Sequence, residues 1–103
     1  MAKVQLSENS ENQTVTISIR GRFDFSTHKE FRAAYKDRGD GFSRYVVNMR
    51  DVEYIDSSAL GMLLLLREHA MPHGGNVVIK DCKPDIEKIL KIANFGRLFD
   101  VCS

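Results

Sequence analysis

An aspartate followed by two serines is the group in this 103-residue chain whose types and spacing offer chemistry. Asp56-Ser57-Ser58 stands directly before Ala59 to Leu66, an apolar stretch without a charged residue. Asp or Ser before such a run starts a helix, because its side-chain oxygen accepts a free N–H of the first turn. We therefore expect Asp56 or Ser57 to cap a helix. A serine hydroxyl exposed there meets the positive end of the helix dipole, which favours a phosphate.

Catalysis by these serines lacks its usual partners. A nucleophilic serine needs a base within hydrogen-bonding reach, and no histidine stands near Ser57 in the sequence. Neither a Gly-x-Ser-x-Gly elbow nor a phosphate-binding glycine motif is present. His69 and His73 have metal-ligand spacing on a helix, but Pro72 between them is expected to end the helix first. We therefore predict no catalytic residue, no metal site and no cofactor.

The two serines stand at the start of a predicted helix, which follows one predicted strand and precedes another. A β-branched apolar run within residues 43–49 predicts a central strand, and a more polar connection follows over residues 48–53. The helix is expected over residues 57–70, where Pro72 and two glycines stop it. Consecutive apolar residues within 76–80 predict a strand buried on both faces. This order is a βαβ unit, whose strands run parallel with a right-handed crossover.

Two short strands are expected before this unit. Residues 4–6 alternate between apolar and polar, and residues 14–19 alternate cleanly. A polar turn joins them, so the two strands are expected to pair antiparallel. Gly21 is expected to break the second strand, leaving residues 22–23 as a brief third strand.

A first helix is expected next. Thr27 and Glu30 have the spacing of a capping box, with Ser26 as a rival cap. The turn residues at 38–41 are expected to end this helix. Its apolar face is predicted to consist of Phe31, Ala34 and Tyr35.

A third helix and a tail are expected at the C-terminus. Pro84 suits the first position of a helix. Residues 97–101 are predicted to form a short turn and tail. The apolar stripe of this helix is predicted to consist of Ile86, Ile89, Leu90 and Ala93.

Charge and composition exclude several classes of protein. With 15 basic and 14 acidic residues, the chain has no basic excess to neutralise phosphates, which argues against a nucleic-acid partner. Residues 59–66, the longest uncharged apolar run, fall short of the ~20 residues that span a bilayer, so no membrane insertion is expected. No secretory signal is visible. Cys82 and Cys102 are expected to be reduced thiols, with a disulfide as the alternative, and the expected compartment is the cytoplasm.

The segment from Asp56 to Gly61, DSSALG, resembles the signature of the anti-sigma-factor-antagonist family, the single-domain STAS proteins. The family pattern is Asp-Ser-Ser/Thr-Gly-Leu-Gly before an apolar helix, and Ala59 stands where the family has glycine. Gly21-Arg22-Phe23-Asp24 also matches a family step that leads to an acidic loop residue. The resemblance implies one α/β domain over residues 1–103, with the STAS fold. In that fold a mixed sheet of about four to five strands carries helices mainly on one side.

The resemblance also implies a phosphorylation switch. The serine that a partner kinase phosphorylates corresponds to Ser57, with Ser58 as the runner-up, and Asp24 and Asp56 lie beside it. The unphosphorylated family member binds an anti-sigma factor or related regulator, which is often a GHKL-type serine kinase. Phosphorylation ends that binding and a PP2C-type phosphatase restores it, so the domain is a ligand and a substrate but not an enzyme. The residues expected to contact the partner are Ser58, Ala59, Leu60, Gly61 and Met62.

Alternatives remain for the residues and for the protein. Many helices begin with Asp-Ser or Ser-Ser and are never modified, and Asp24 is equally well interpreted as a loop aspartate that caps the first helix. The apolar helix over residues 59–66 is interpreted either as core or as an exposed patch for a partner. The alternative function is a STAS subunit of a membrane transport complex, which docks a transporter or ATPase partner without phosphorylation. A small enzyme or nucleotide-binding domain is a third possibility, which lacks a base, a metal set and a phosphate loop.

Overall fold

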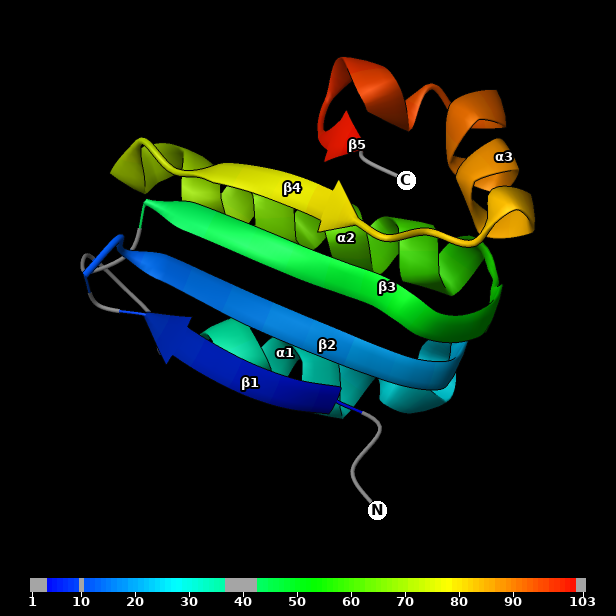
Figure 1. Ribbon diagram of the computed structural model, residues 1–103, viewed down its shortest axis with the longest axis horizontal. Coiled ribbons are helices and arrows are strands. Elements are labelled where there is room, and N and C mark those ends of the chain that lie inside the picture. The colour runs from blue at the N-terminus through cyan, green and yellow to red at the C-terminus, as the bar shows by residue number, and fades with distance from the viewer. Residues whose placement is uncertain (1–3, 10, 37–42, 102–103) are drawn as a thin grey trace.

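A mixed five-stranded sheet forms the framework, in a computed structural model that describes residues 4–9, 11–36 and 43–101 (Figure 1). The strands lie in chain order, β1-β2-β3-β4-β5, with β1 antiparallel to β2 and every other neighbouring pair parallel. The bounds of the strands are β1 Val4–Asn9, β2 Thr14–Phe23, β3 Arg44–Ile55, β4 Asn76–Lys80 and β5 Asp100–Val101. The predicted α/β class and the parallel pairing of β3 with β4 are therefore confirmed.

Helices α1 and α2 cover one face of the sheet, and α3 lies beyond β4 (Figure 1). Short 3-10 turns precede or follow the α-helices. The bounds of the helices are η1 Phe25–Thr27, α1 His28–Lys36, α2 Ser57–Ala70, η2 Met71–His73, α3 Pro84–Ile92 and η3 Phe95–Arg97. The predicted bounds of α2 and β4 agree with the structure.

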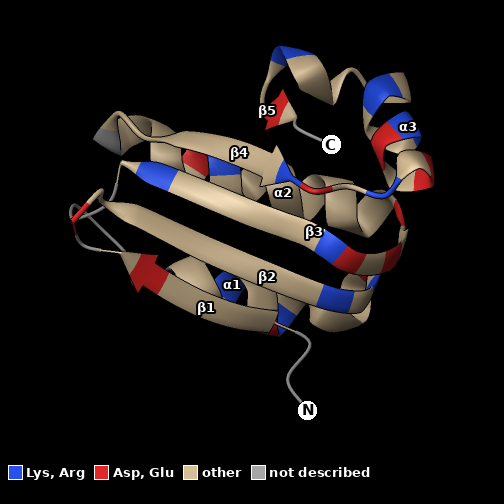
Figure 2. Ribbon diagram, in the orientation of Figure 1, with Lys and Arg blue, Asp and Glu red and all other residues tan. Residues whose placement is uncertain are grey.

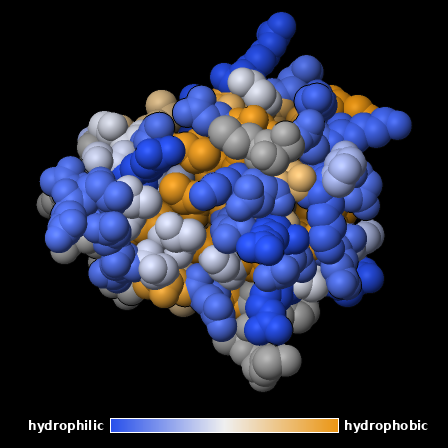
Figure 3. Space-filling view, viewed as in Figure 1, coloured by the Kyte–Doolittle hydropathy of each residue, from blue (hydrophilic) through white to orange (hydrophobic). Residues whose placement is uncertain are grey.

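The core lies between the sheet and α1 and α2. Along β2 the apolar residues at alternate positions face these helices, while Thr14, Thr16 and Ser18 lie on the open face, as strand geometry requires. Figure 3, which views this open face, shows mostly hydrophilic side chains with apolar atoms visible between them. The fully buried large side chains include Ile17, Ile19, Phe23, Phe31, Tyr45, Met49, Leu63, Leu66 and Ile79.

Two strands are longer than expected. Gly21 does not end β2, because it adopts a positive φ of 73° at a register irregularity and the strand continues to Phe23. The polar connection predicted at residues 48–53 is strand as well, since β3 runs on to Ile55 beside the extended β2. Its apolar residues Met49 and Val52 are buried while the polar ones point outward. The two extensions pair with each other, so each supplies the hydrogen-bonding partner of the other. The sequence of either segment alone does not predict this pairing.

The predicted capping box at the first helix is wrong. The Thr27 side chain is buried, and its hydroxyl donates to the Arg22 carbonyl at 3.0 Å. The Thr27 N–H, which a capping box pairs with the Glu30 side chain, donates instead to the Asp24 carbonyl at 2.9 Å. Asp24 is the cap instead, at the start of η1, which leads directly into α1. The predicted apolar face of α1 is buried as expected. The turn predicted at residues 38–41 lies outside the described residues.

The C-terminal segment returns to the sheet. Residues 97–101 were expected to form a turn and tail, but β5 pairs parallel with β4, with Ile79 opposite Val101. Phe95 and Phe99 anchor this return, because both are buried and their rings stack with centroids 5.1 Å apart. The predicted stripe on α3 is only half buried: Ile86 and Leu90 are in the core, and Ile89 and Ala93 are exposed. Cys82 is buried, and Cys102 lies outside the described residues.

Candidate functional site

Asp24 and Asp56 leave the sheet side by side. Their preceding residues, Phe23 and Ile55, are register partners at the ends of the parallel strands β2 and β3. The carboxyl ends of parallel strands meet at the same edge of a sheet. Each aspartate then caps a helical segment, η1 for Asp24 and α2 for Asp56. Two helix starts with acidic caps are thus adjacent. The Asp24 cap agrees with the interpretation of Asp24 as a loop aspartate that caps the first helical segment.

The cap of α2 leaves Ser57 as the first residue of the helix. Asp56 has an extended backbone, and its Oδ1 accepts the N–H of Ala59 at 3.0 Å. Ser57 is exposed, whereas Ser58 is partly buried. Of the two serines, Ser57 is therefore the more exposed residue, at the positive end of the α2 dipole.

Both carboxylate oxygens of Asp24 have partners. One carboxylate oxygen, Oδ1, accepts the N–H of Ser26 at 3.0 Å and the Ser26 hydroxyl at 2.5 Å. The other, Oδ2, pairs with Nε of Arg22 at 3.2 Å. The Arg22 guanidinium carbon also lies 4.1 Å from the centre of the Tyr54 ring, a cation–π arrangement. Figure 2 shows basic and acidic residues interleaved at this end of β2 and β3.

An apolar hollow opens between the start of α1 and the first turns of α2. Its volume is about 410 Å³. Phe25 is 71% exposed at its rim, with its ring stacked on His28 at a centroid distance of 5.8 Å. Leu65 is 48% exposed on the α2 side. We call this surface the Phe25 hollow, and it is lined by Phe25, His28, Ser58, Gly61, Met62 and Leu65.

The residues expected to contact a partner divide between core and surface. Ala59 is fully buried and presents no side-chain surface, contrary to its expected role, because the α2 face that carries it packs on the sheet. Met62 is only 3% exposed, and it contributes to the floor of the Phe25 hollow. Leu60 is partly buried against the core, and Gly61 is exposed. Sequence reasoning missed Phe25 and the outward Leu65, because an exposed apolar residue gives no periodic signal.

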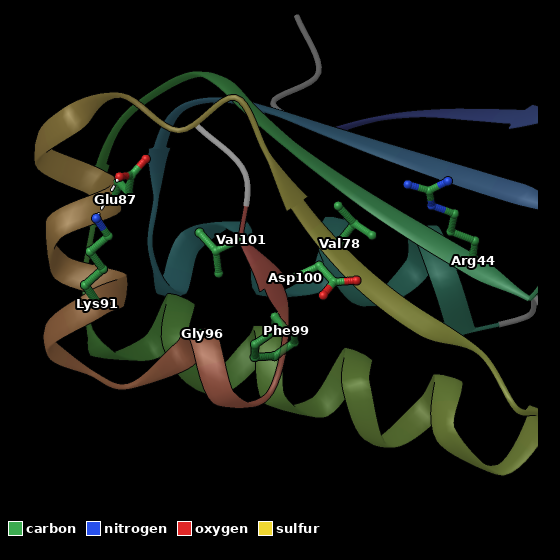
Figure 4. A pocket seen from close by; sticks show the side chains of 8 residues that line it. All are labelled: Arg44, Val78, Glu87, Lys91, Gly96, Phe99, Asp100 and Val101. Carbon is green, nitrogen blue, oxygen red and sulfur yellow. Dashed lines mark ion pairs between the residues drawn. The ribbon is translucent and has the colours of Figure 1, made fainter.

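A second hollow is lined by residues of β3, β4, α3 and the C-terminal segment that ends in β5 (Figure 4). Its volume is about 540 Å³. The charged residues on its α3 wall, Glu87 and Lys91, pair with each other at 3.2 Å and do not converge on a central point. None of the predicted site residues lines it.

Neither a metal centre nor a membrane span is found in the described part of the chain. Over residues 4–9, 11–36 and 43–101, no three His, Cys, Asp or Glu side chains cluster in a way that could hold a metal ion. Within the same ranges, no helix has the length and hydropathy needed to cross a bilayer. The side chain of His73, one half of the metal pair considered above, lies outside the described residues.

Comparison with known proteins gives consistent matches. A family model described as Mlab, STAS domain, matches residues 6–100. A STAS-domain containing protein of Pseudomonas aeruginosa (strain UCBPP-PA14) is 47% identical over 93 residues, which are 90% of this chain and 92% of that protein.

Solved structures match in fold at low identity. The anti-sigma factor antagonist SpoIIAA, from Bacillus, in its unphosphorylated form has a TM-score of 0.80 at 19% identity, covering 97% of this chain and 88% of that one. Its phosphorylated form has a TM-score of 0.68 at 17% identity, covering 97% and 91%. A sulfate transporter family protein from Wolinella succinogenes has a TM-score of 0.77 at 17% identity, covering 87% and 76%.

The family model spans most of the chain, and the Pseudomonas relative is similar over nearly its whole length. The strand order, the acidic cap of α2 and the serine that follows it agree with the resemblance carried by Asp56–Gly61. The chain belongs to the STAS domain family.

Proposed function

We propose that this chain is an anti-sigma-factor antagonist that acts by partner switching through Ser57. Unphosphorylated, it binds an anti-sigma factor or a related regulator, such as a GHKL-type serine kinase. The kinase transfers the γ-phosphoryl group of ATP to the Ser57 hydroxyl and the regulator is released. A PP2C-type phosphatase hydrolyses the phosphoserine and restores binding. In this cycle, placed in the cytoplasm, the domain is a ligand and a substrate, and ATP and metal ions belong to its partners.

One observation carries this proposal: Ser57 is exposed at an acid-capped helix start that adjoins the Phe25 hollow. A kinase needs a hydroxyl that reaches its active site, and Ser57 meets that need better than Ser58. Ser58 lines the hollow and is partly buried, so it suits contact with a docked partner. The two serines thus divide into a modified residue and a contact residue.

Electrostatics explains how one phosphate would release a partner. Phosphoserine carries a charge of about −1.5 to −2. The α2 dipole favours this charge, whereas Asp24 and Asp56 repel it, so the change inside the domain is small. A partner docked over the helix start would have to bury a dianion for which its own surface offers no counter-ion, at a cost of several kcal/mol. The switch therefore acts on the interface and not on the fold.

The Phe25 hollow supplies the affinity in this proposal. Interfaces gain most of their binding energy from a few apolar anchors that become buried in the complex. Phe25 and Leu65 are exposed apolar side chains on opposite walls of the hollow, close to the Ser57 helix start. An apolar side chain of the regulator between them would place its surrounding residues over Ser57.

The relatives give independent support for the switch. SpoIIAA, which shares this fold, is named an anti-sigma factor antagonist and is described in both unphosphorylated and phosphorylated forms. The acidic cap and the adjacent serine needed for such a modification are intact here. Ala59, which departs from the family pattern, is buried, and Ser57 is exposed at the same helix start.

A second candidate is a STAS subunit of a membrane transport complex. The fold shared with a sulfate transporter family protein supports it. In that case the Phe25 hollow docks a transporter or ATPase subunit, and Ser57 stays unmodified. Copurification of the protein with membranes, independent of any Ser57 substitution, favours this second function.

Phosphosite mass spectrometry tests the first function. The protein is isolated from its native cells as the wild type, as Ser57→Ala and as Ser58→Ala. Phosphate on Ser57 that persists in Ser58→Ala and disappears in Ser57→Ala is the expected result. Phosphate on Ser58 alone would move the modified site by one residue. Absence of phosphate under all growth conditions would count against the switch.

A further inference from the structure

Arg22 beside the candidate site has no role in the cycle described so far. Its side chain projects from β2 and is 60% exposed. Nε pairs with Oδ2 of Asp24 at 3.2 Å, and the guanidinium carbon lies 4.1 Å from the centre of the Tyr54 ring. Arg22 and Tyr54 are register partners on β2 and β3, one residue before the pair that leads into the two aspartates. The cation is therefore held at the strand edge from which the α2 helix start emerges.

The contacts of Asp24 allow Arg22 to leave it. The oxygen that caps η1 is Oδ1, which holds the N–H and hydroxyl of Ser26, while Arg22 uses Oδ2. Loss of the arginine thus leaves the cap in place. Because an exposed ion pair of this kind contributes little, typically under ~1 kcal/mol, a stronger acceptor nearby can displace it.

A phosphate on Ser57 is such an acceptor. Guanidinium binds phosphate through two parallel N–H bonds, and charge-assisted bonds of this type are stronger than neutral ones. Stacking on Tyr54 keeps the guanidinium plane oriented, so less side-chain freedom is lost when the phosphate binds. Arg22 also offsets the repulsion that Asp24 and Asp56 exert on the dianion.

We propose that Arg22 is the counter-ion of phosphorylated Ser57, exchanging Asp24 for the phosphate when the serine is modified. This inference rests on the proposed function and names how the modified state is stabilised. Arg22 acts as a positioning residue that holds the phosphate at the rim of the Phe25 hollow. In this position the phosphate lies within the surface that a docked partner would bury.

The test is a titration that needs no kinase. Phosphoserine is installed at position 57 during translation, and the pKa of its phosphate is measured by 31P NMR. Pairing with Arg22 favours the dianion, so Arg22→Gln is expected to raise this pKa by about half a unit. Arg22→Lys keeps the charge and is expected to retain part of the effect. Arg50→Gln, which removes an exposed arginine of β3 at the same end of the sheet, is the matched control and should leave the pKa unchanged.

A double variant separates direct pairing from an indirect effect through Asp24. Asp24→Asn keeps the cap, since asparagine caps as well as aspartate. If Arg22 binds the phosphate directly, Arg22→Gln still raises the phosphate pKa in the Asp24→Asn background. An equal pKa with and without Arg22 in that background would overturn the proposal. Because phosphoserine is installed, this result stands apart from the search for phosphate on Ser57 in cells, which tests the proposed function.

Discussion

Phe25 is the side chain through which the proposed partner surface can be tested without disturbing the fold. It is 71% exposed, so Phe25→Ala removes apolar area that is available to a partner. Of the roughly 200 Å² that a phenylalanine can bury, about 140 Å² would be covered in a complex. At about 25 cal/mol per Å² this area contributes up to about 3.5 kcal/mol, and alanine retains part of it. We expect partner affinity to fall about 30- to 150-fold, which corresponds to about 2–3 kcal/mol.

Isothermal titration calorimetry of the regulator against the unphosphorylated protein measures this loss, and urea unfolding checks that the free energy of unfolding changes by less than about 1 kcal/mol. Ile92→Ala is the matched control, because Ile92 is 73% exposed on α3 and does not line the Phe25 hollow. It should leave the affinity unchanged. An unchanged affinity in Phe25→Ala, or an equal loss in Ile92→Ala, would refute the placement of the interface.

Three further predictions concern stability, each measured by urea unfolding. Asp56→Ala removes the α2 cap and should lower the free energy of unfolding by about 1 kcal/mol, whereas Asp56→Asn should be nearly neutral; equal losses would contradict the cap. Leu63→Ala should cost about 2–5 kcal/mol, because Leu63 is fully buried, and a cost below 1 kcal/mol would contradict its place in the core. Burial raises the pKa of Tyr35 above 10.0, with Arg32 opposing this, so the unfolded chain loses the phenol proton first and stability should fall as pH rises past about 10. Tyr35→Phe should reduce that alkaline loss, and an unchanged pH profile would argue against the raised pKa.

The βαβ unit could be predicted from the sequence because each of its boundaries has a local cause. Asp56 caps the helix and Pro72 follows its end. The consecutive apolar residues within 76–80 indicate a strand that is buried on both faces. The additional length of β2 and β3 could not be predicted. The polar residues in these extensions are typical of loops. They form strands because the ends of β2 and β3 pair with each other, and this pairing is a long-range contact. The two-residue β5 is too short for any periodicity.

The candidate site was predictable only in part. Local capping rules explain Asp56 and the position of Ser57, whereas the nearness of Asp24 followed from the family resemblance. Its structural cause is the parallel pairing of β2 with β3, a long-range contact without a local signature. Residues 59–66 are apolar on nearly every side of α2, so the sequence does not show which side of the helix packs on the sheet. Ala59 was therefore expected at the surface, but it lies in the core. Phe25 begins the three-residue turn η1, which is too short to show a periodic pattern, and only the structure places its ring beside α2.

The most direct test of partner switching is the affinity of one regulator for the two forms of this protein. The regulator is captured from native cells with the Ser57→Ala protein and identified by mass spectrometry. Its affinity is then measured for the unmodified protein and for the protein with phosphoserine installed at position 57, with phosphoserine at the exposed position 7 of β1 as the control. The account predicts at least a 100-fold weaker affinity for the form phosphorylated at Ser57. Equal affinity for the unmodified and Ser57-phosphorylated forms would contradict it.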